Sequence, residues 1–190
     1  MDIADFTLRE LLGIALGLAI ATFMIYFPYI WCRRRRETEE SYGLRWFMGR
    51  GAALETAIAV LLSVVPLTFM SYYWPMGFNF KTVGGPFSLD LWTALNMLGG
   101  GLGAAFIEET FYRGWLQTIV VRKWGAYLAV PLVALVFALS HLFVAPSWLR
   151  VATFFPGLVM GLLRHRHGSV LPSIIYHALC NVWAVWWMPR

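Results

Sequence analysis

Long stretches without Lys, Arg, Asp or Glu constrain this chain more than any other feature of its sequence. A helix needs about 20 apolar residues to cross the hydrocarbon core of a bilayer. Six stretches approach or exceed that length: Leu11–Cys32, Thr56–Phe80, Leu91–Ile107, Trp124–Leu149, Gly168–Pro189 and the shorter Val151–Leu163. The composition agrees, because 59% of the residues are hydrophobic and 13% are charged. The sequence therefore predicts an all-α, polytopic transmembrane helix bundle with about six membrane helices.

The domain organisation follows from these stretches. We expect one integral membrane domain over residues 1–190, with two N-terminal helices in residues 1–80 and a core in residues 88–188. The first stretch follows Asp2, Asp5 and Glu10 and runs into the basic sequence WCRRRR, so we interpret it as an anchor and not as a cleavable signal peptide. The loop over residues 74–90 is long enough for a lid or a substrate entrance, although a plain connector is the alternative.

The basic residues predict the orientation of the chain. They gather at one set of helix ends, which the positive-inside rule places in the cytoplasm, with both termini outside. This set is Arg33, Arg34, Arg35, Arg36, Arg45, Arg50, Arg122, Lys123, Arg164 and Arg166. A net charge of +5 with this distribution favours contact with the lipid bilayer and argues against nucleic acid as a partner. Cys32 and Cys180 lie in or beside apolar stretches, where we expect free thiols.

Small and aromatic residues predict how the helices pack. Glycines recur at four-residue spacing in the pairs Gly13 and Gly17, Gly99 and Gly103, and Gly157 and Gly161. Such pairs let membrane helices approach closely. Three tryptophans near the C-terminus, Trp183, Trp186 and Trp187, favour an aromatic belt at the membrane interface.

The sequence AFIEETFYRG places three charged side chains in an otherwise apolar region. Ionisable groups at membrane depth are costly, and a functional site facing the bundle interior is their default interpretation. Glu109 and Arg113 are four residues apart on one helix face, so they can form an ion pair. Glu108 points elsewhere, toward a face of small residues that includes Gly101 and Ala105. Burial there favours a carboxylate able to take a proton near neutral pH.

Two later helices carry the other polar groups. The sequence FALSH places Phe137 and His141 on one helix face, and HALCN does the same for His177 and Asn181. A single buried histidine is more often a hydrogen-bonded core residue than a catalyst. Together, however, a carboxylate, two imidazoles and a carboxamide supply a base, a group that orients water and donors for a developing oxyanion.

These three motifs, EETFYR, FALSH and HALCN, resemble those of the CPBP family, the CAAX-protease and bacteriocin-processing (ABI) intramembrane endopeptidases. The family pattern is EExxxR, FxxxH and HxxxN/B in this order on successive helices. The resemblance covers roughly residues 90–185 and does not extend to the first two helices. The chain is short for the family, which often has eight membrane helices.

The resemblance implies a glutamate-dependent peptidase and a role for each motif residue. Glu108 would be the general base and His141 would hold the attacking water. The oxyanion would be stabilised by His177 and Asn181, while Glu109 and Arg113, with Phe137, would orient the site. No cofactor is expected. The implied substrate is a membrane-associated protein or peptide, and the chain resembles a prokaryotic plasma-membrane member. The oligomeric state stays open.

Three alternatives remain at this point. Glu108, His141 and His177 could form a zinc site with an open fourth position, although HExxH is missing and Asn181 is a poor zinc ligand. A non-enzymatic immunity or binding protein could use the polar set for packing alone, at a high cost in buried polar groups. A transporter also buries Glu and His, but it would usually show a repeated half.

Overall fold

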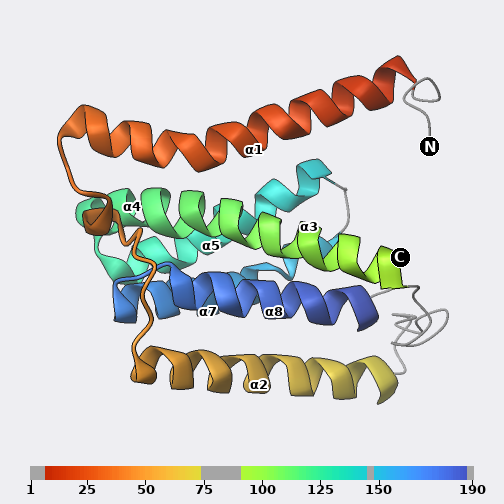
Figure 1. Ribbon diagram of the computed structural model, residues 1–190. Helices are drawn as coiled ribbons and strands as arrows, with labels where there is room; N and C mark the ends of the chain where they lie inside the picture. The colour runs from red at the N-terminus through yellow and green to blue at the C-terminus, as the bar shows by residue number, and fades with distance from the viewer. Residues whose placement is uncertain (1–6, 74–90, 145–147, 188–190) are drawn as a thin grey trace.

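The computed structural model describes residues 7–73, 91–144 and 148–187, and the regular structure in these ranges is entirely helical. Long helices run side by side between the two ends of a bundle (Figure 1). The longer elements are α1 (Leu8–Arg35), α2 (Arg50–Tyr73), α3 (Leu91–Glu109), α5 (Ala126–Val144), α7 (Phe154–His167) and α8 (Leu171–Trp187). The shorter elements are η2 (Glu39–Tyr42), η3 (Thr110–Leu116), α4 (Gln117–Trp124) and α6 (Trp148–Val151). The predicted all-α bundle is confirmed.

Each of the six apolar stretches overlaps one of the longer helices within the described residues. Within the described residues, three segments are long and apolar enough to cross a membrane: Leu8–Arg35, Arg50–Met70 and Ala126–Phe143. These segments are mostly exposed on the outside of the bundle, as lipid-facing helices are. Crossing by α3, α7 and α8 as well stays a prediction. The possible lid at residues 74–90 lies outside the described residues.

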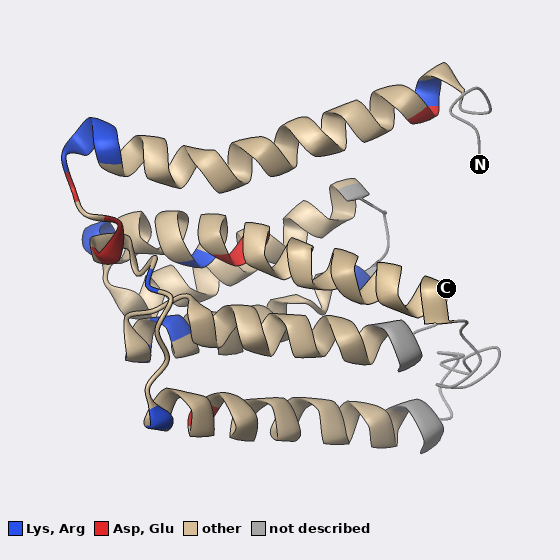
Figure 2. Cartoon of the chain, viewed as in Figure 1, with Lys and Arg blue, Asp and Glu red and all other residues tan. Residues whose placement is uncertain are grey.

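The charged residues lie mainly at one end of the bundle, where α1, α4 and α7 end and α2 begins (Figure 2). Arg122 at the end of α4 forms an ion pair with Glu37 in the connection after α1, and it also donates to the Tyr42 hydroxyl. The Arg122 guanidinium holds the pKa of the Glu37 carboxyl below its ordinary value. The arrangement supports the predicted clustering of basic residues. Which side of the membrane this end faces stays a prediction.

Helix α8 lies in the interior between α3 and α2, and it also packs against α7. A second packed unit is formed by α5, which contacts both α7 and α4. Helix α1 reaches the bundle through η3 and α3, and its N-terminal half diverges from the other helices (Figure 1). The main hydrophobic cluster joins these elements through Tyr112, Val133, Phe137, Met160, Leu163 and Tyr176. The core therefore surrounds the helices that carry the three motifs.

The helix of the first motif is not a regular α-helix. After Glu109, η3 adopts π-helical hydrogen bonding from Thr110 to Leu116, and α4 then continues to Trp124. Such π-turns inside longer helices are frequent at functional sites, because each inserts backbone that changes the direction of the following side chains. The irregular turn begins directly after the two glutamates. The regular helical spacing used to pair Glu109 with Arg113 does not reveal this irregular turn.

The predicted close packing at paired glycines holds for one pair. A Cβ atom at Gly161 would lie 2.9 Å from Val130 Cγ1 and 3.2 Å from Gln117 Oε1, and one at Gly157 would lie 3.2 Å from Ala134 Cβ. These two glycines let α7 approach both α5 and α4. At Gly99 and Gly103 a Cβ would meet nothing within 4 Å among the described residues. Gly13 and Gly17 on α1 have the same open surroundings in that part of the chain.

Adding a methyl group at Gly161 should therefore destabilise the bundle. We expect Gly161→Ala to lower the free energy of unfolding by about 1–3 kcal/mol, because Val130 and Gln117 must move to admit it. The measurement is the thermal unfolding midpoint of the purified protein in detergent. Gly99→Ala is the matched control, since it adds the same group to a helix at an open position. Equal unfolding midpoints for the two variants would contradict the packing described for α7.

Candidate active site

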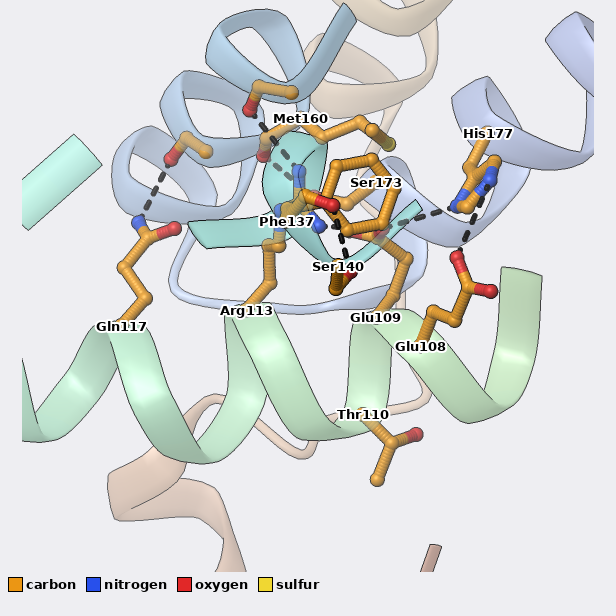
Figure 3. A network of polar contacts seen from close by, with 12 residues as sticks. Glu108, Glu109, Thr110, Arg113, Gln117, Phe137, Ser140, Met160, Ser173 and His177 are labelled. Atoms are coloured by element: carbon orange, nitrogen blue, oxygen red, sulfur yellow. Dashed lines mark hydrogen bonds and ion pairs between the residues drawn. The ribbon is translucent and has the colours of Figure 1, made fainter. Parts of the chain in front are cut away.

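Side chains of the three motifs lie close together, as Figure 3 shows for Glu108, Glu109 and Arg113 of the first motif, Phe137 of the second and His177 of the third. The Phe137 ring connects them, because its centroid lies 4.6 Å from that of His141 and 5.7 Å from that of His177. The guanidinium carbon of Arg113 lies 4.2 Å from the same ring, within the range of a cation–π contact. One aromatic side chain thus contacts a group from each motif.

The first motif supplies a fully buried ion pair. Arg113 Nη1 donates to Glu109 Oε1 at 3.0 Å, and both side chains have an exposed fraction of 0%. The other guanidinium nitrogen, Nη2, donates to the carbonyl oxygen of Gly157 at 3.2 Å. The absence of a side chain at Gly157 leaves space for this contact. The predicted pairing of Glu109 with Arg113 is confirmed, and it also attaches the motif helix to α7.

Glu109 has a second partner that the helix spacing could not reveal. His177 Nδ1 lies 3.0 Å from Glu109 Oε1, the same oxygen that accepts from Arg113. A carboxylate oxygen accepts, so Nδ1 carries the hydrogen and the ring orientation is defined. The other ring nitrogen, Nε2, faces Glu108 Oε2 at 3.9 Å (Figure 3). His177 therefore lies between the two glutamates, and Glu109 orients it.

Glu108 differs from its neighbour in exposure and in partners. Its side chain is 27% exposed, whereas that of Glu109 is 0% exposed. Its Oε2 atom is buried and has no hydrogen-bond partner among the described residues. The Glu108 side chain is therefore partly exposed, and no guanidinium of the described residues is hydrogen-bonded to its Oε2 atom. A group with these properties can accept a proton from a bound molecule.

The second motif orients its histidine through the backbone. His141 Nδ1 lies 2.8 Å from the carbonyl oxygen of Phe137, which can only accept, so Nδ1 carries the hydrogen. In the neutral ring the lone pair is then on Nε2. Ser140 Oγ donates to the same carbonyl at 2.7 Å and reinforces this turn of α5. The four-residue spacing of Phe137 and His141 therefore sets the tautomer of the imidazole.

The third motif attaches α8 to α3 at a second point. Asn181 Nδ2 donates to the carbonyl oxygen of Gly101 at 2.9 Å. A Cβ at Gly101 would approach Asn181 Cβ to 3.1 Å, so this glycine admits the carboxamide. The small residue Gly101 thus accommodates α8 beside α3. The second Nδ2 hydrogen of Asn181 remains available for a ligand.

The polar network extends beyond the predicted residues. Gln117 Nε2 donates to the Gly161 carbonyl at 2.9 Å, one helical turn beyond the contact of Arg113 with Gly157. Ser173 Oγ donates to the Met160 carbonyl at 2.7 Å and joins α8 to α7. Arg113 and Gln117 are four residues apart, and this spacing could have predicted that Gln117 faces the same helix, α7, as Arg113 does. The acceptor carbonyls carried no such signal, because every residue has one.

Comparison with known protein families shows which family contains this segment. Residues 90–183 match the family described as type II CAAX prenyl endopeptidase Rce1-like, and these residues contain all three motifs. Through this segment the chain belongs to the Rce1-like CAAX-protease family. No curated protein and no solved structure matches the chain at a significant level. The family assignment supports a CAAX-type intramembrane protease in general, acting on a membrane-associated protein or peptide.

Glu108, His141 and His177 are also the residues of the alternative zinc site. Within residues 7–73, 91–144 and 148–187, no three His, Cys, Asp or Glu side chains are grouped as a metal ion would require. His177 Nδ1 faces Glu109 and His141 Nδ1 faces a backbone carbonyl, so neither contact occupies the Nε2 atom of its ring. Metal-binding histidines commonly have such a partner on the other ring nitrogen, and the chelator experiment below therefore decides between a zinc-dependent and a metal-free site.

Replacing Arg113 should expose the dependence of the site on its ion pair. We expect Arg113→Met to lower the free energy of unfolding by about 3–5 kcal/mol, since Glu109 would remain as a buried charge without its guanidinium. Arg45→Met is the control, because Arg45 and Glu40 form an ion pair with side chains that are 52% and 70% exposed. Its removal should cost about 0–1 kcal/mol.

Thermal unfolding midpoints of the two purified variants in detergent provide the comparison. A loss at Arg113 no larger than that at Arg45 would show that the buried pair does not stabilise the bundle.

Proposed function

We propose that this chain is a glutamate-dependent intramembrane endopeptidase with Glu108 as its general base. The observation that carries the proposal is the partly exposed carboxylate of Glu108 within a segment of the CAAX-protease family. Its Oε2 atom lies 3.9 Å from His177 Nε2 and accepts no hydrogen bond from the described residues. The reaction is hydrolysis of a peptide bond in a membrane-associated protein or peptide. The chemistry needs a base, an oriented water and donors for the oxyanion.

In the first step Glu108 takes a proton from a water molecule as the water oxygen bonds to the scissile carbonyl carbon. His141 supports this step, because its neutral ring has a lone pair on Nε2 that can accept the second water hydrogen. When the carbon–nitrogen bond breaks, the protonated Glu108 returns the proton to the departing amine. The carboxylate is thereby restored, and one water has been added across the peptide bond.

The oxyanion of the tetrahedral intermediate would be stabilised from α8. Asn181 offers the Nδ2 hydrogen that is not donated to Gly101. His177 can donate from Nε2 only when both ring nitrogens carry hydrogen, since Nδ1–H already points at Glu109.

The proposal needs no metal and no organic cofactor. The protein would act in the plasma membrane of a prokaryote, with both termini outside and the basic ends of its helices in the cytoplasm. Prenylated CAAX proteins, sorting tags, peptide pheromones and bacteriocin precursors share the required feature of a peptide held at the membrane.

The test compares peptide termini in membranes of cells that carry the wild-type chain or the Glu108→Gln variant, each with and without a chelator. Glutamine keeps the shape of the side chain and removes the base, so we expect cleavage to fall by about 10²–10⁴-fold. Cleavage by the wild type should persist in the chelator. Glu40→Gln is the control, because Glu40 is a carboxylate in an exposed surface ion pair.

Each other outcome has a defined meaning. Loss of cleavage in the chelator would favour a zinc-dependent protease on the same residues and would refute the metal-free mechanism. Defined termini that persist unchanged in Glu108→Gln would refute Glu108 as the base. Equal amounts of folded protein, measured by size-exclusion chromatography in detergent, ensure that the comparison concerns chemistry.

A further inference from the structure

Helix α8 presents two different faces to the two helices beside it. On one face His177 contacts Glu109 and Asn181 contacts the Gly101 carbonyl, so this face carries the candidate site toward α3. The opposite neighbour is α2, which lies before the segment that matches the family. A helix held between two neighbours keeps its rotation only if both contacts are specific. The contact with α2 therefore bears on the direction of the catalytic side chains.

Two hydrogen bonds join α8 to α2. The hydroxyl oxygens of Ser63 and Tyr176 are 2.7 Å apart, and Trp183 Nε1 donates to Thr68 Oγ1 at 2.7 Å. Tyr176 is 1% exposed and Trp183 is 8% exposed, so both lie inside the bundle. The predicted interfacial belt is therefore wrong for Trp183, while the side chains of Trp186 and Trp187 lie outside the described ones.

The two α8 residues that bond to α2 lie on either side of His177 and Asn181 in the sequence. Tyr176 directly precedes His177, and Trp183 follows Asn181 by two residues. Residues seven apart, such as Tyr176 and Trp183, share one helix face, whereas His177 and Asn181 share another. Apolar packing alone would set the distance between α2 and α8. Directional hydrogen bonds at two heights also set the rotation and the axial position of α8.

We infer that Ser63 and Thr68 of α2 are positioning residues that hold His177 and Asn181 in register with α3. The inference rests on the proposed function for its effect on catalysis, and on the two hydrogen bonds for its geometry. Their hydrogen bonds to α8 are made with Tyr176 and Trp183 and not with His177 or Asn181. Their effect acts through Tyr176 and Trp183, because a rotated α8 would misdirect both catalytic side chains together.

The activity test uses Ser63→Ala, Tyr176→Phe and the double variant. Each single change removes one hydroxyl of the same bond, and we expect kcat to fall by about 10- to 100-fold with little change in KM. The double variant should lose no more than either single variant, since both remove one interaction. Ser63→Thr restores a hydroxyl and should recover activity.

Thr56→Val is the matched control on the same helix. Thr56 is buried on α2, but its hydroxyl donates to the Ala52 carbonyl within that helix. Valine has a similar shape and lacks the hydroxyl, so a general effect of removing a buried hydroxyl from α2 would appear here. We expect the kcat of this variant to equal that of the wild type.

A second measurement does not depend on activity. The chain has two cysteines, so a Cys32→Ala background leaves Cys180 as its single thiol. Cys180 lies between His177 and Asn181 and packs against the core cluster of Tyr176. Ser63→Ala in this background should raise the rate of Cys180 alkylation by a small maleimide about fivefold, because α8 is less firmly held. Thr56→Val should leave the rate unchanged.

Together the two measurements separate the inference from the proposed function. Faster labelling with reduced kcat supports the positioning role, whereas faster labelling with unchanged kcat overturns it. Unchanged labelling overturns the structural contact itself. If the wild type and Glu108→Gln show equal activity, the proposed function fails, and the labelling rates alone then decide whether Ser63 holds α8.

Discussion

One buried carboxylate oxygen holds the motif helices together. Glu109 Oε1 accepts from Arg113 of the same helix and from His177 of α8. Arg113 in turn donates to the Gly157 carbonyl of α7 and lies over the Phe137 ring of α5. A carboxylate away from water must find its donors within the protein. The buried pair of Glu109 and Arg113 therefore has contacts with three other helices, α8, α7 and α5.

The network is incomplete in an informative way. Buried oxygens of Glu108 and Glu109, and the Gln117 side-chain oxygen, have no hydrogen-bond partner among the described residues. Unsatisfied polar atoms cost free energy, and a bundle selected only for stability would replace them with apolar groups. Arg113 Nε, Trp115 Nε1 and Arg164 Nε also lack a partner among the described residues, so such atoms extend from Glu108 through η3 to the end of α7. Incomplete satisfaction is therefore a property of the whole polar network and not of Glu108 alone.

The sequence predicted the features that depend on local spacing. Charge-free stretches located the helices, and a four-residue step paired Glu109 with Arg113. It could not reveal that His177 lies against Glu109, because a contact between residues 68 positions apart depends on how helices pack. The π-turn after Glu109 was missed because no residue type specifies it. The four-residue spacing of glycines predicted more close helix contacts than the described structure shows, since a Cβ at Gly99 would meet nothing within 4 Å there.

The dependence of α8 on α2 limits how far the motif segment is self-sufficient. Residues 90–183 contain all three motifs but not α2, the helix to which Tyr176 and Trp183 are hydrogen-bonded. In a fragment confined to that segment, these polar groups would face hydrocarbon without partners. The segment therefore depends on α2 for these two buried polar contacts, and transplanting it between scaffolds would require an equivalent of α2 to preserve them.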